Sequence, residues 1–299
     1  MNKKAAVLIV ILIAILVFAL FYFIINFHAN KVVNIDTGKE YATIQEAIDA
    51  NETLNGHRLL VYPGVYNEYV KVDKTLTIKG QSRDETIVER GSESVIIILV
   101  TANSSTVANL TVRDSTFGIW CRDVKNCSVL NNKVINCTTG IRIDRSGSSA
   151  PVRTNCLVKD NEVLNGTLRG IHLYNVSDNT VTDNFIQRIE DVGGSYAAID
   201  VELSSNNTIV HNQLNNNYCG IWINIDASNN TVYHNNFINN TLQVKIWGEN
   251  TTWDDGSRGN YWSDYKGTDA NGDGIGDTPY VIAADNKDRY PLMVPEAFP

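Results

Sequence analysis

Residues 118–144, GIWCRDVKNCSVLNNKVINCTTGIRID, contain one complete unit of a repeat and the start of the next. Successive units open at spacings of 22, 30, 28 and 22 residues, each with a small residue followed by isoleucine: Gly118, Gly140, Gly170, Ala198 and Gly220. A second position repeats in the same units, where an asparagine stands three residues after valine or isoleucine: Asn132, Asn161, Asn184, Asn212 and Asn235. Apolar residues alternate after each opening position, which is typical of β-strands. Units of this length, with no helical stretch between the strands, predict parallel coils stacked about 4.8 Å apart.

The predicted fold class is therefore all-β, a single-stranded right-handed parallel β-helix preceded by one N-terminal transmembrane helix. We expect ladders of isoleucine and valine to fill the interior of the coil. We expect the repeated asparagines at tight corners, because asparagine tolerates the left-handed conformation and its amide can bond to the coils above and below. The longer units imply loops inserted near residues 145–155 and 188–196, and inserted loops often carry function.

The first 30 residues predict a membrane anchor. Residues 5–27 carry no charge, and a helix of these 23 residues would be about 35 Å long, enough to cross a bilayer. Lys3 and Lys4 favour a cytoplasmic N-terminus and an extracytoplasmic body, so we predict a single-pass protein of the cell membrane. A cleaved signal peptide is the alternative.

Three regions are expected along the chain. Residues 1–30 form the cytoplasmic stub and the anchor, and residues 31–250 form the β-helix. Residues 251–299 form an aromatic and Asp/Gly-rich segment. A short helix at residues 41–50 should cap the first coil, because Thr43 and Glu46 make a capping box before an apolar helix face.

Composition excludes one class of partner. The net charge is −8, the pI is near 5.1, and no run of lysine or arginine is present to neutralise phosphates, so nucleic acid is not expected as a partner. Five cysteines are too few for a disulfide scaffold, and the equivalent Cys127 and Cys156 are expected to be buried free thiols. Eleven Asn-x-Ser/Thr sequons fit either a glycoprotein or a repeat that combines Asn turns with Thr-containing strands.

Several segments carry a family resemblance over about residues 34–295. YATIQEAIDA (41–50) and LLVYPGVYNEYVKVDKTLTIKG (59–80) resemble the opening of pectin-lyase-like right-handed β-helices, and the Gly-Ile and Asn-Asn repeats resemble the NosD-like branch. GNYWSDYKGTDANGDGIGDTPYVI (259–282) is similar to the tail of archaeal surface proteins of that branch.

This resemblance implies the fold, while the activity stays open because the fold hosts enzymes and proteins without catalysis. The motifs of β-helix polygalacturonases, pectinesterases and epimerases are missing, so enzymatic activity is not predicted. The NosD name implies a copper-delivery role in nitrous oxide reductase assembly. The chain has only five histidines and, apart from Met1, only Met293, so copper handling is kept as an alternative.

The Asp/Gly-rich segment predicts a calcium loop. Oxygen ligands alternate with residues that allow sharp bends, as hard cations require, and the predicted ligands are Asp269, Asn271, Asp273, the carbonyl of Ile275, and Asp277. Tyr280 stands where an EF-hand would carry its bidentate glutamate, so the loop departs from that pattern. A solvated turn without a metal is the alternative.

Alignment of the repeats produces two columns that alternation places on the outside of one sheet. The first contains Trp120, Arg142, His172, Asp200, Trp222 and Lys245, and the second contains Arg122, Asp144, Tyr174, Glu202, Asn224 and Trp247. Exposed aromatic rings beside charged and amide groups predict a glycan-binding face. A solvated face of paired charges is one alternative, and acid–base catalysis by the carboxylates with His172 is another.

The function predicted from these features is a membrane-anchored, extracytoplasmic surface protein that binds carbohydrate or serves a structural role. The first alternative is a calcium-dependent polysaccharide lyase, hydrolase or epimerase. The second is a NosD-like copper accessory protein. His211 and His234 occupy equivalent positions in adjacent coils, as do Asp160 and Asp183 before them, so either a surface transition-metal site or a hydrated Asn-turn flank is expected there.

Overall fold

The computed structural model describes residues 30–89, 95–147, 151–191 and 193–298. The predicted anchor at residues 5–27 lies outside the described residues. No helix in the described part has both the length and the apolar character that a bilayer crossing requires.

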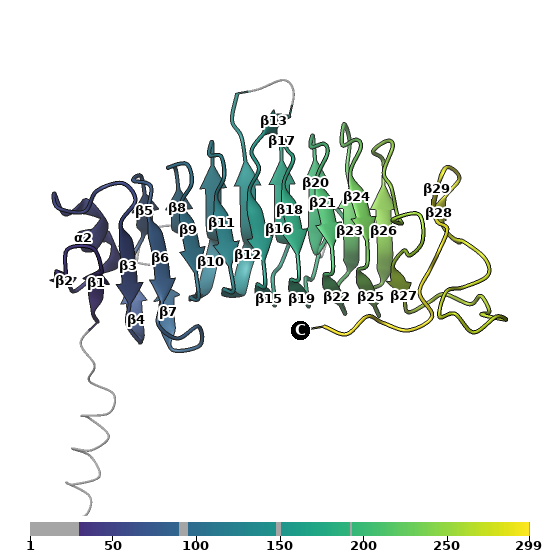
Figure 1. The fold of residues 1–299 in the computed structure, drawn as a ribbon, viewed down its shortest axis with the longest axis horizontal. Helices are drawn as coiled ribbons and strands as arrows, with labels where there is room; N and C mark the ends of the chain where they lie inside the picture. Colours follow the sequence, from purple (N-terminus) through teal and green to yellow (C-terminus); the bar gives the residue numbers. More distant parts are fainter. Residues whose placement is uncertain (1–29, 90–94, 148–150, 192, 299) are drawn as a thin grey trace, which may run out of the picture.

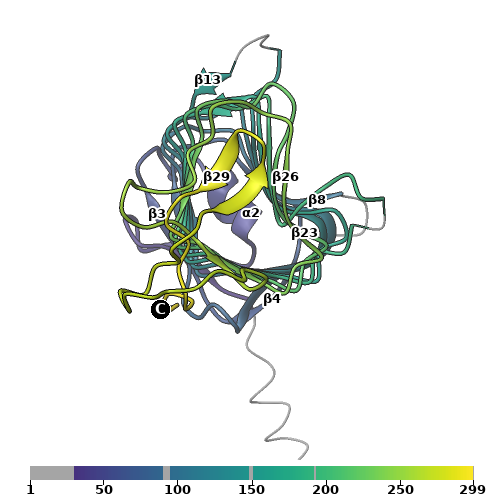
Figure 2. The ribbon, with the colours of Figure 1, turned by 90° about the vertical axis from the view of Figure 1, so that its right-hand side faces the viewer.

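The described chain winds into an elongated stack of coils with three sides (Figures 1 and 2). Consecutive coils pair through parallel strands, except at the N-terminal edge and in the last hairpin. The prediction of an all-β, mostly parallel fold is confirmed. Each central coil contributes three strands, one more than the minimum of two that the repeat requires.

The first side is a ten-stranded sheet. In spatial order its strands are β2 (Glu40–Tyr41), β1 (Val32–Asn34), β3 (Arg58–Val61), β6 (Thr77–Gly80), β9 (Thr106–Ala108), β11 (Ser128–Leu130), β14 (Leu157–Lys159), β18 (Thr180–Thr182), β21 (Thr208–Val210) and β24 (Thr231–Tyr233).

The second and third sides form one sheet of 15 strands, because β10 (Thr111–Arg122) and β12 (Lys133–Asp144) run across the corner between them. The other strands of the second side are β4 (Gly64–Asn67), β7 (Thr86–Glu89), β15 (Glu162–Leu164), β19 (Phe185–Gln187), β22 (Gln213–Asn215), β25 (Asn236–Ile238) and β27 (Tyr261–Trp262). The other strands of the third side are β5 (Val70–Val72), β8 (Ile96–Val100), β16 (Arg169–Tyr174), β20 (Ile199–Glu202), β23 (Cys219–Ile223) and β26 (Leu242–Ile246). A two-stranded pair, β13 (Val152–Arg153) with β17 (Val176–Ser177), stands at the corner after the third side.

Ladders of apolar side chains fill the interior, as predicted. Ile119, Ile141, Ile171, Ile199 and Ile221 are in register across the third side and are all fully buried. The opening glycines are required by close packing. A Cβ atom on Gly140 would lie 2.7 Å from the carbonyl oxygen of Gly170 in the next coil. All five cysteines are buried free thiols, as expected for Cys127 and Cys156.

The asparagine ladder is present but its position differs from the prediction. Asn132, Asn161, Asn184, Asn212 and Asn235 point inward and bond to one another through their amides, and Asn260 extends the ladder. The left-handed conformation falls on the residue immediately before each: Asn131, Asp160, Asp183, His211 and His234. The physical reason is that this preceding residue turns the corner, which leaves the next side chain directed into the coil.

Most sequon asparagines also adopt the left-handed backbone conformation. Nine of the eleven sequon asparagines have positive φ: Asn109, Asn126, Asn136, Asn165, Asn175, Asn206, Asn229, Asn239 and Asn250. Corner geometry therefore accounts for asparagine at these positions whether or not a glycan is attached.

Both ends of the stack are covered. The helix α2 (Ile44–Asp49) lies across the first coil, and its buried face is Ile44, Ala47 and Ile48 as predicted. Thr43 accepts a hydrogen bond from the amide of Glu46, and the Glu46 carboxylate accepts one from Ala42. At the other end the antiparallel hairpin β28 (Tyr280–Ala283) and β29 (Asn286–Asp288) lies over the lumen (Figure 2).

Candidate functional site

The two predicted columns lie on the outer face of the third side. Trp120 pairs with Arg142, and the register continues through His172, Asp200 and Trp222 to Lys245. In the second column Arg122, Asp144, Tyr174 and Glu202 are likewise in register. Their inward neighbours belong to the core, so the predicted alternation is confirmed.

The expectation that these columns are exposed is wrong for five of their twelve residues. His172, Asp200 and Trp222 are buried, as are Asp144 and Asn224. Trp247 is the one tryptophan of the columns that is largely exposed, at 62%.

The cover includes Gly194, Tyr196 and Ala197, which lie in or directly after the insertion predicted at residues 188–196. Ala197 packs against Cys219 and Trp222, and Tyr196 lies under the Arg169 guanidinium, 3.7 Å from ring centroid to Cζ. Lys245 reaches the segment by donating to the Gly194 carbonyl at 3.0 Å. These residues therefore cover Trp222 and reach Arg169 and Lys245, whereas Phe117, Trp120 and Tyr174 stay partly exposed.

The open part holds a row of aromatic rings and arginine. Trp120 donates to Asp144 at 2.8 Å, and the same carboxylate accepts from Arg142 at 2.8 Å. The Arg142 guanidinium lies 5.2 Å from the Trp120 ring and 5.3 Å from the Tyr174 ring. Phe117 packs on Trp120 with ring centroids 4.8 Å apart. The row is thus held rigid by contacts within itself, with the ring surfaces half-buried.

A polar cluster adjoins this row where the cover begins. His172 Nε2 lies 3.4 Å from Glu202 Oε2, and Asp200 accepts from Arg169 at 2.7 Å. The His172–Glu202 contact lacks the angles of a hydrogen bond. Within the described chain, both ring nitrogens of His172 and Oδ1 of Asp200 are buried without a hydrogen-bond partner.

The protonation states follow from burial and neighbouring charge. Burial lowers the pKa of His172 to about 3, so the ring is neutral at physiological pH. Burial raises the pKa of Asp200 to about 6, against the opposing effect of Arg169. Contact with His172, followed by the guanidinium charges, lowers the pKa of Glu202. Two guanidinium groups beside the cluster disfavour a bound cation, although His172, Asp200 and Glu202 converge within 4.8 Å.

The predicted calcium loop is an exposed turn stabilised by its own side chains. The Asp269 carboxylate accepts from the amides of Gly272, Asp273 and Gly274. Asp273 accepts from the amide of Ile275 and from the side chain of Asn271. Asp277 accepts from Thr268 and from the Ala270 amide. Each carboxylate retains lone pairs that a cation could use, and all of these groups lie near solvent.

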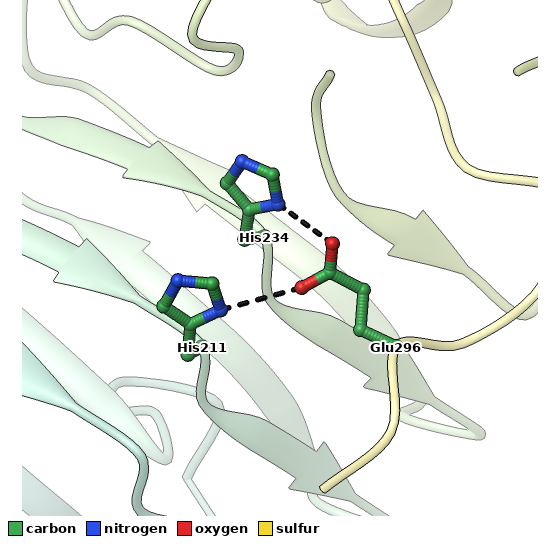
Figure 3. A group of neighbouring side chains, drawn as sticks. All are labelled: His211, His234 and Glu296. Atoms are coloured by element: carbon green, nitrogen blue, oxygen red, sulfur yellow. Dashed lines mark hydrogen bonds and ion pairs between the residues drawn. The ribbon is translucent and has the colours of Figure 1, made fainter.

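A histidine cluster lies at the corner between the first and second sides (Figure 3). His211 Nδ1 is 3.3 Å from Glu296 Oε2, and His234 Nδ1 is 2.7 Å from Glu296 Oε1. Glu296 belongs to the C-terminal tail, which runs back along the coils (Figure 1). The repeat alignment had paired the two histidines but had not indicated Glu296.

The sequence model of the family described as "Periplasmic copper-binding protein (NosD)" matches residues 30–267. This chain belongs to the NosD family. The predicted resemblance is confirmed.

Relatives of this NosD-family chain are similar over limited stretches. A cell surface glycoprotein of Methanothermus fervidus is 33% identical over 108 residues, which are 36% of this chain and 18% of that protein. A probable ABC transporter binding protein NosD of Stutzerimonas stutzeri is 32% identical over 137 residues, which are 42% of this chain and 31% of that protein. The chain therefore spans less than a third of the length of these relatives.

Among solved structures, pectin methylesterase PemA from Erwinia chrysanthemi aligns with a TM-score of 0.42 and 16% identity, covering 67% of this chain and 69% of that one. Pectin methylesterase from Yersinia enterocolitica aligns with a TM-score of 0.36 and 13% identity, covering 70% and 82%.

The family description names copper. The side chains of this protein that could bind a metal suit Cu(II) better than Cu(I). Soft thiolate and thioether ligands select Cu(I), but all five cysteines are sealed in the coil and Met293 is the only methionine after Met1. Imidazole and carboxylate groups suit Cu(II) and zinc, and His211, His234 and Glu296 offer such a set.

Proposed function

We propose that this protein is an extracytoplasmic, cell-surface β-helix protein that binds a polysaccharide along the open part of its third side. The observation that carries the proposal is the row of Phe117, Trp120, Arg142 and Tyr174, which presents rigid, half-buried rings on a regular sheet. Flat apolar rings suit the C–H faces of sugars. Glu202, a partly exposed carboxylate, lies beside the row and offers a partner for hydroxyl groups.

The row also sets the form of the ligand. Trp120 and Tyr174 lie on the first and third of three consecutive coils, so they are separated by about two coil spacings, or roughly 10 Å along the axis. An extended chain of sugar units can contact both. Arg142 and Arg169 are already paired with Asp144 and Asp200, so we expect modest selectivity for ligand charge.

Substituting Trp120→Ala together with Tyr174→Ala should reduce polysaccharide retention about tenfold, equivalent to roughly 1.4 kcal/mol, because two stacking surfaces are removed. The measurement is affinity electrophoresis of the full chain across acidic and neutral polysaccharides. Any detergent used to keep the full chain in solution should have no sugar headgroup, so that it does not compete with the polysaccharide for the site.

Tyr69→Ala is the matched control, because Tyr69 is exposed and is not part of the row. Its retention should equal that of the parent. Unchanged retention of the double variant on every glycan that the parent binds would show that this face carries no binding site.

An enzymatic function on the same face is the second candidate, because Asp200, with a pKa raised to about 6, stands beside the ionised Glu202. Such a pair can divide acid and base roles. Asp200 is fully buried beneath the cover, however, so we favour binding. Product release should be measured in the same incubations. Release that disappears in Asp200→Asn but persists in the Tyr69→Ala control would favour the enzyme.

We also propose that the turn at Asp269–Asp277 binds calcium. Millimolar calcium should then raise the melting temperature of the full chain, because a ligand that binds only the folded state stabilises it by mass action. Asp273→Ala should remove most of that increase, since it deletes one ligand of the loop. Differential scanning calorimetry with calcium and with chelator provides the measurement. Identical melting curves in the two conditions would eliminate a calcium role for this loop.

A further inference from the structure

We infer that His211, His234 and Glu296 bind one divalent transition-metal ion of the zinc and copper(II) class, and that this ion fastens the C-terminal tail to the corner of the β-helix. The site lies away from the proposed glycan face, so the two proposals can fail separately. Imidazole nitrogen and carboxylate oxygen are ligands of this metal class, whereas calcium and magnesium prefer oxygen alone.

The coil geometry fixes the two histidines. They follow β21 and β24, whose partners Val210 and Tyr233 are in register. Both histidines adopt the left-handed corner conformation, with φ of 55° and 56°. Their rings stack with centroids 5.0 Å apart and planes 24° from parallel, and both Nδ1 atoms face the Glu296 carboxylate (Figure 3). Backbone pairing between coils therefore sets the distance between the two imidazole ligands before any metal arrives.

The tail carries the third ligand and is held independently of the histidines. Asn236 donates to the Glu296 carbonyl at 2.8 Å and accepts from the Glu296 amide at 2.9 Å. Beyond Glu296, Phe298 packs edge-on against Phe185 with ring centroids 6.0 Å apart. These contacts hold the carboxylate over the two Nδ1 atoms.

A second carboxylate orients His234 from behind. Asp255 Oδ2 lies 3.0 Å from Nε2 of His234, and Asp255 is itself fixed by the amides of Ser257 and Arg258. Histidines that bind metals usually donate their other N–H to such a carboxylate. This contact engages Nε2 of His234 and leaves Nδ1 as the atom available to a metal.

The two ring nitrogens of His234 each face a carboxylate, and one N–H is too few to satisfy both contacts. A neutral imidazole carries one N–H, yet His234 faces Asp255 at Nε2 and Glu296 at Nδ1. If the N–H donates to Asp255, the lone pair of Nδ1 faces the Glu296 carboxylate at 2.7 Å. A second proton on His234 satisfies that contact when no metal is bound, and a metal ion at Nδ1 would take the place of that proton.

Space for the ion is present. A small cavity of about 40 Å³ is lined by Asp183, His211, His234, Asn236, Glu296, Ala297 and Phe298. The three ligand atoms lie within 4.8 Å of one another, and rotations of both imidazole rings and of the Glu296 carboxylate would bring them around an ion with bonds of about 2.0–2.2 Å. Three protein ligands leave a fourth position for water or an exchanging ligand, which suits reversible loading.

The test is calorimetric titration of the purified full chain with Zn²⁺, Cu²⁺ and Ca²⁺. We expect one Zn²⁺ or Cu²⁺ per chain at this site, unaffected by excess Ca²⁺. His211→Ala and His234→Ala should each weaken binding by about 100-fold or more, and Asp255→Asn by roughly tenfold. His57→Ala is the matched control because His57 lies on the N-terminal coils, and its binding should equal that of the parent.

A second readout follows the tail itself. Zn²⁺ should slow hydrogen exchange of residues 291–298 in the parent, and Glu296→Gln should abolish that slowing. Glu296 lies outside the β-helix strands, so this variant keeps the test valid if a histidine variant misfolds. A folded parent that binds neither Zn²⁺ nor Cu²⁺, equal binding in a His211→Ala, His234→Ala double variant, or tail exchange that ignores the metal would each overturn the inference.

Discussion

Replacing Asn212 by alanine should lower the free energy of unfolding by about 3–6 kcal/mol, because it interrupts a fully buried amide ladder. The side-chain oxygen Oδ1 of Asn212 accepts from the backbone amide and from the side-chain amide of Asn184. Its amide donates to the carbonyls of Val181 and Val210 and to Asn235. The substitution leaves several buried groups without partners on both neighbouring coils. Denaturant-induced unfolding measures the loss.

Asn212→Leu separates hydrogen bonding from packing. Leucine restores most of the side-chain volume but none of the amide bonds, so it should be about as destabilising as alanine. Asn51→Ala is the control, because Asn51 is exposed and has no left-handed backbone to lose. Its effect should stay within about 0.5 kcal/mol. Recovery of stability in Asn212→Leu would mean that the ladder contributes volume rather than hydrogen bonds.

The ladder also explains why so much of the fold was predictable. Each coil repeats an inward apolar pair and an asparagine whose amide must bond to the next coil, so the register is encoded in every unit. A slip of one residue would turn the ladder outward and expose its amides. The columns of the third side followed from the same register. What the repeat could not predict was their burial.

Trp222 packs against Ala197 of the inserted loop, and Tyr196 of the loop contacts Arg169, which bonds to the buried Asp200. The place of the loop in the repeat is visible as extra length, but the path of the loop is not. Asp191 accepts from the amides of Gly193 and Tyr196 and so folds the loop on itself. Tyr196 of the loop then meets Arg169, 27 residues before it, and Gly194 meets Lys245, 51 residues after it. No periodic pattern signals such contacts.

The contacts of the C-terminal tail are even harder to predict from the sequence than those of the inserted loop. Glu296 lies 60 residues from Asn236, the residue that holds it, and the segment between them contains a turn-rich region without a repeat. The two histidines could be paired by alignment because they occupy equivalent coil positions. Their carboxylate partner could not, because the chain reaches it by reversing direction. The sequence therefore predicts the two histidines of this site, which lie in the repeat, but not Glu296, which lies outside it.

The C-terminal cap is where a single substitution should disturb the whole stack. Trp262 is almost completely buried, with ring centroids 4.2 Å from both Phe237 and Tyr280 and interplanar angles of 15° and 6°. Its indole donates to Asp288 at 2.8 Å, and Asp288 also accepts from the amide of Asn260, the last residue of the asparagine ladder. One side chain thus joins the interior, the ladder and the closing hairpin.

Trp262→Ala should lower the free energy of unfolding by about 3–5 kcal/mol, because it leaves a large cavity and removes one hydrogen bond from the buried Asp288 carboxylate. Loss of the cap should also expose the last coil, whose strand edges can pair with another molecule. We therefore expect earlier unfolding in denaturant, rapid proteolysis after residue 250, and self-association in light scattering.

Trp262→Phe should recover part of the stability by retaining the stack without the bond to Asp288. Trp247→Ala is the matched control, since that ring is 62% exposed, and it should change stability by less than about 1 kcal/mol. Equal stability of the Trp262→Ala and Trp247→Ala variants would show that the coils close without this cap.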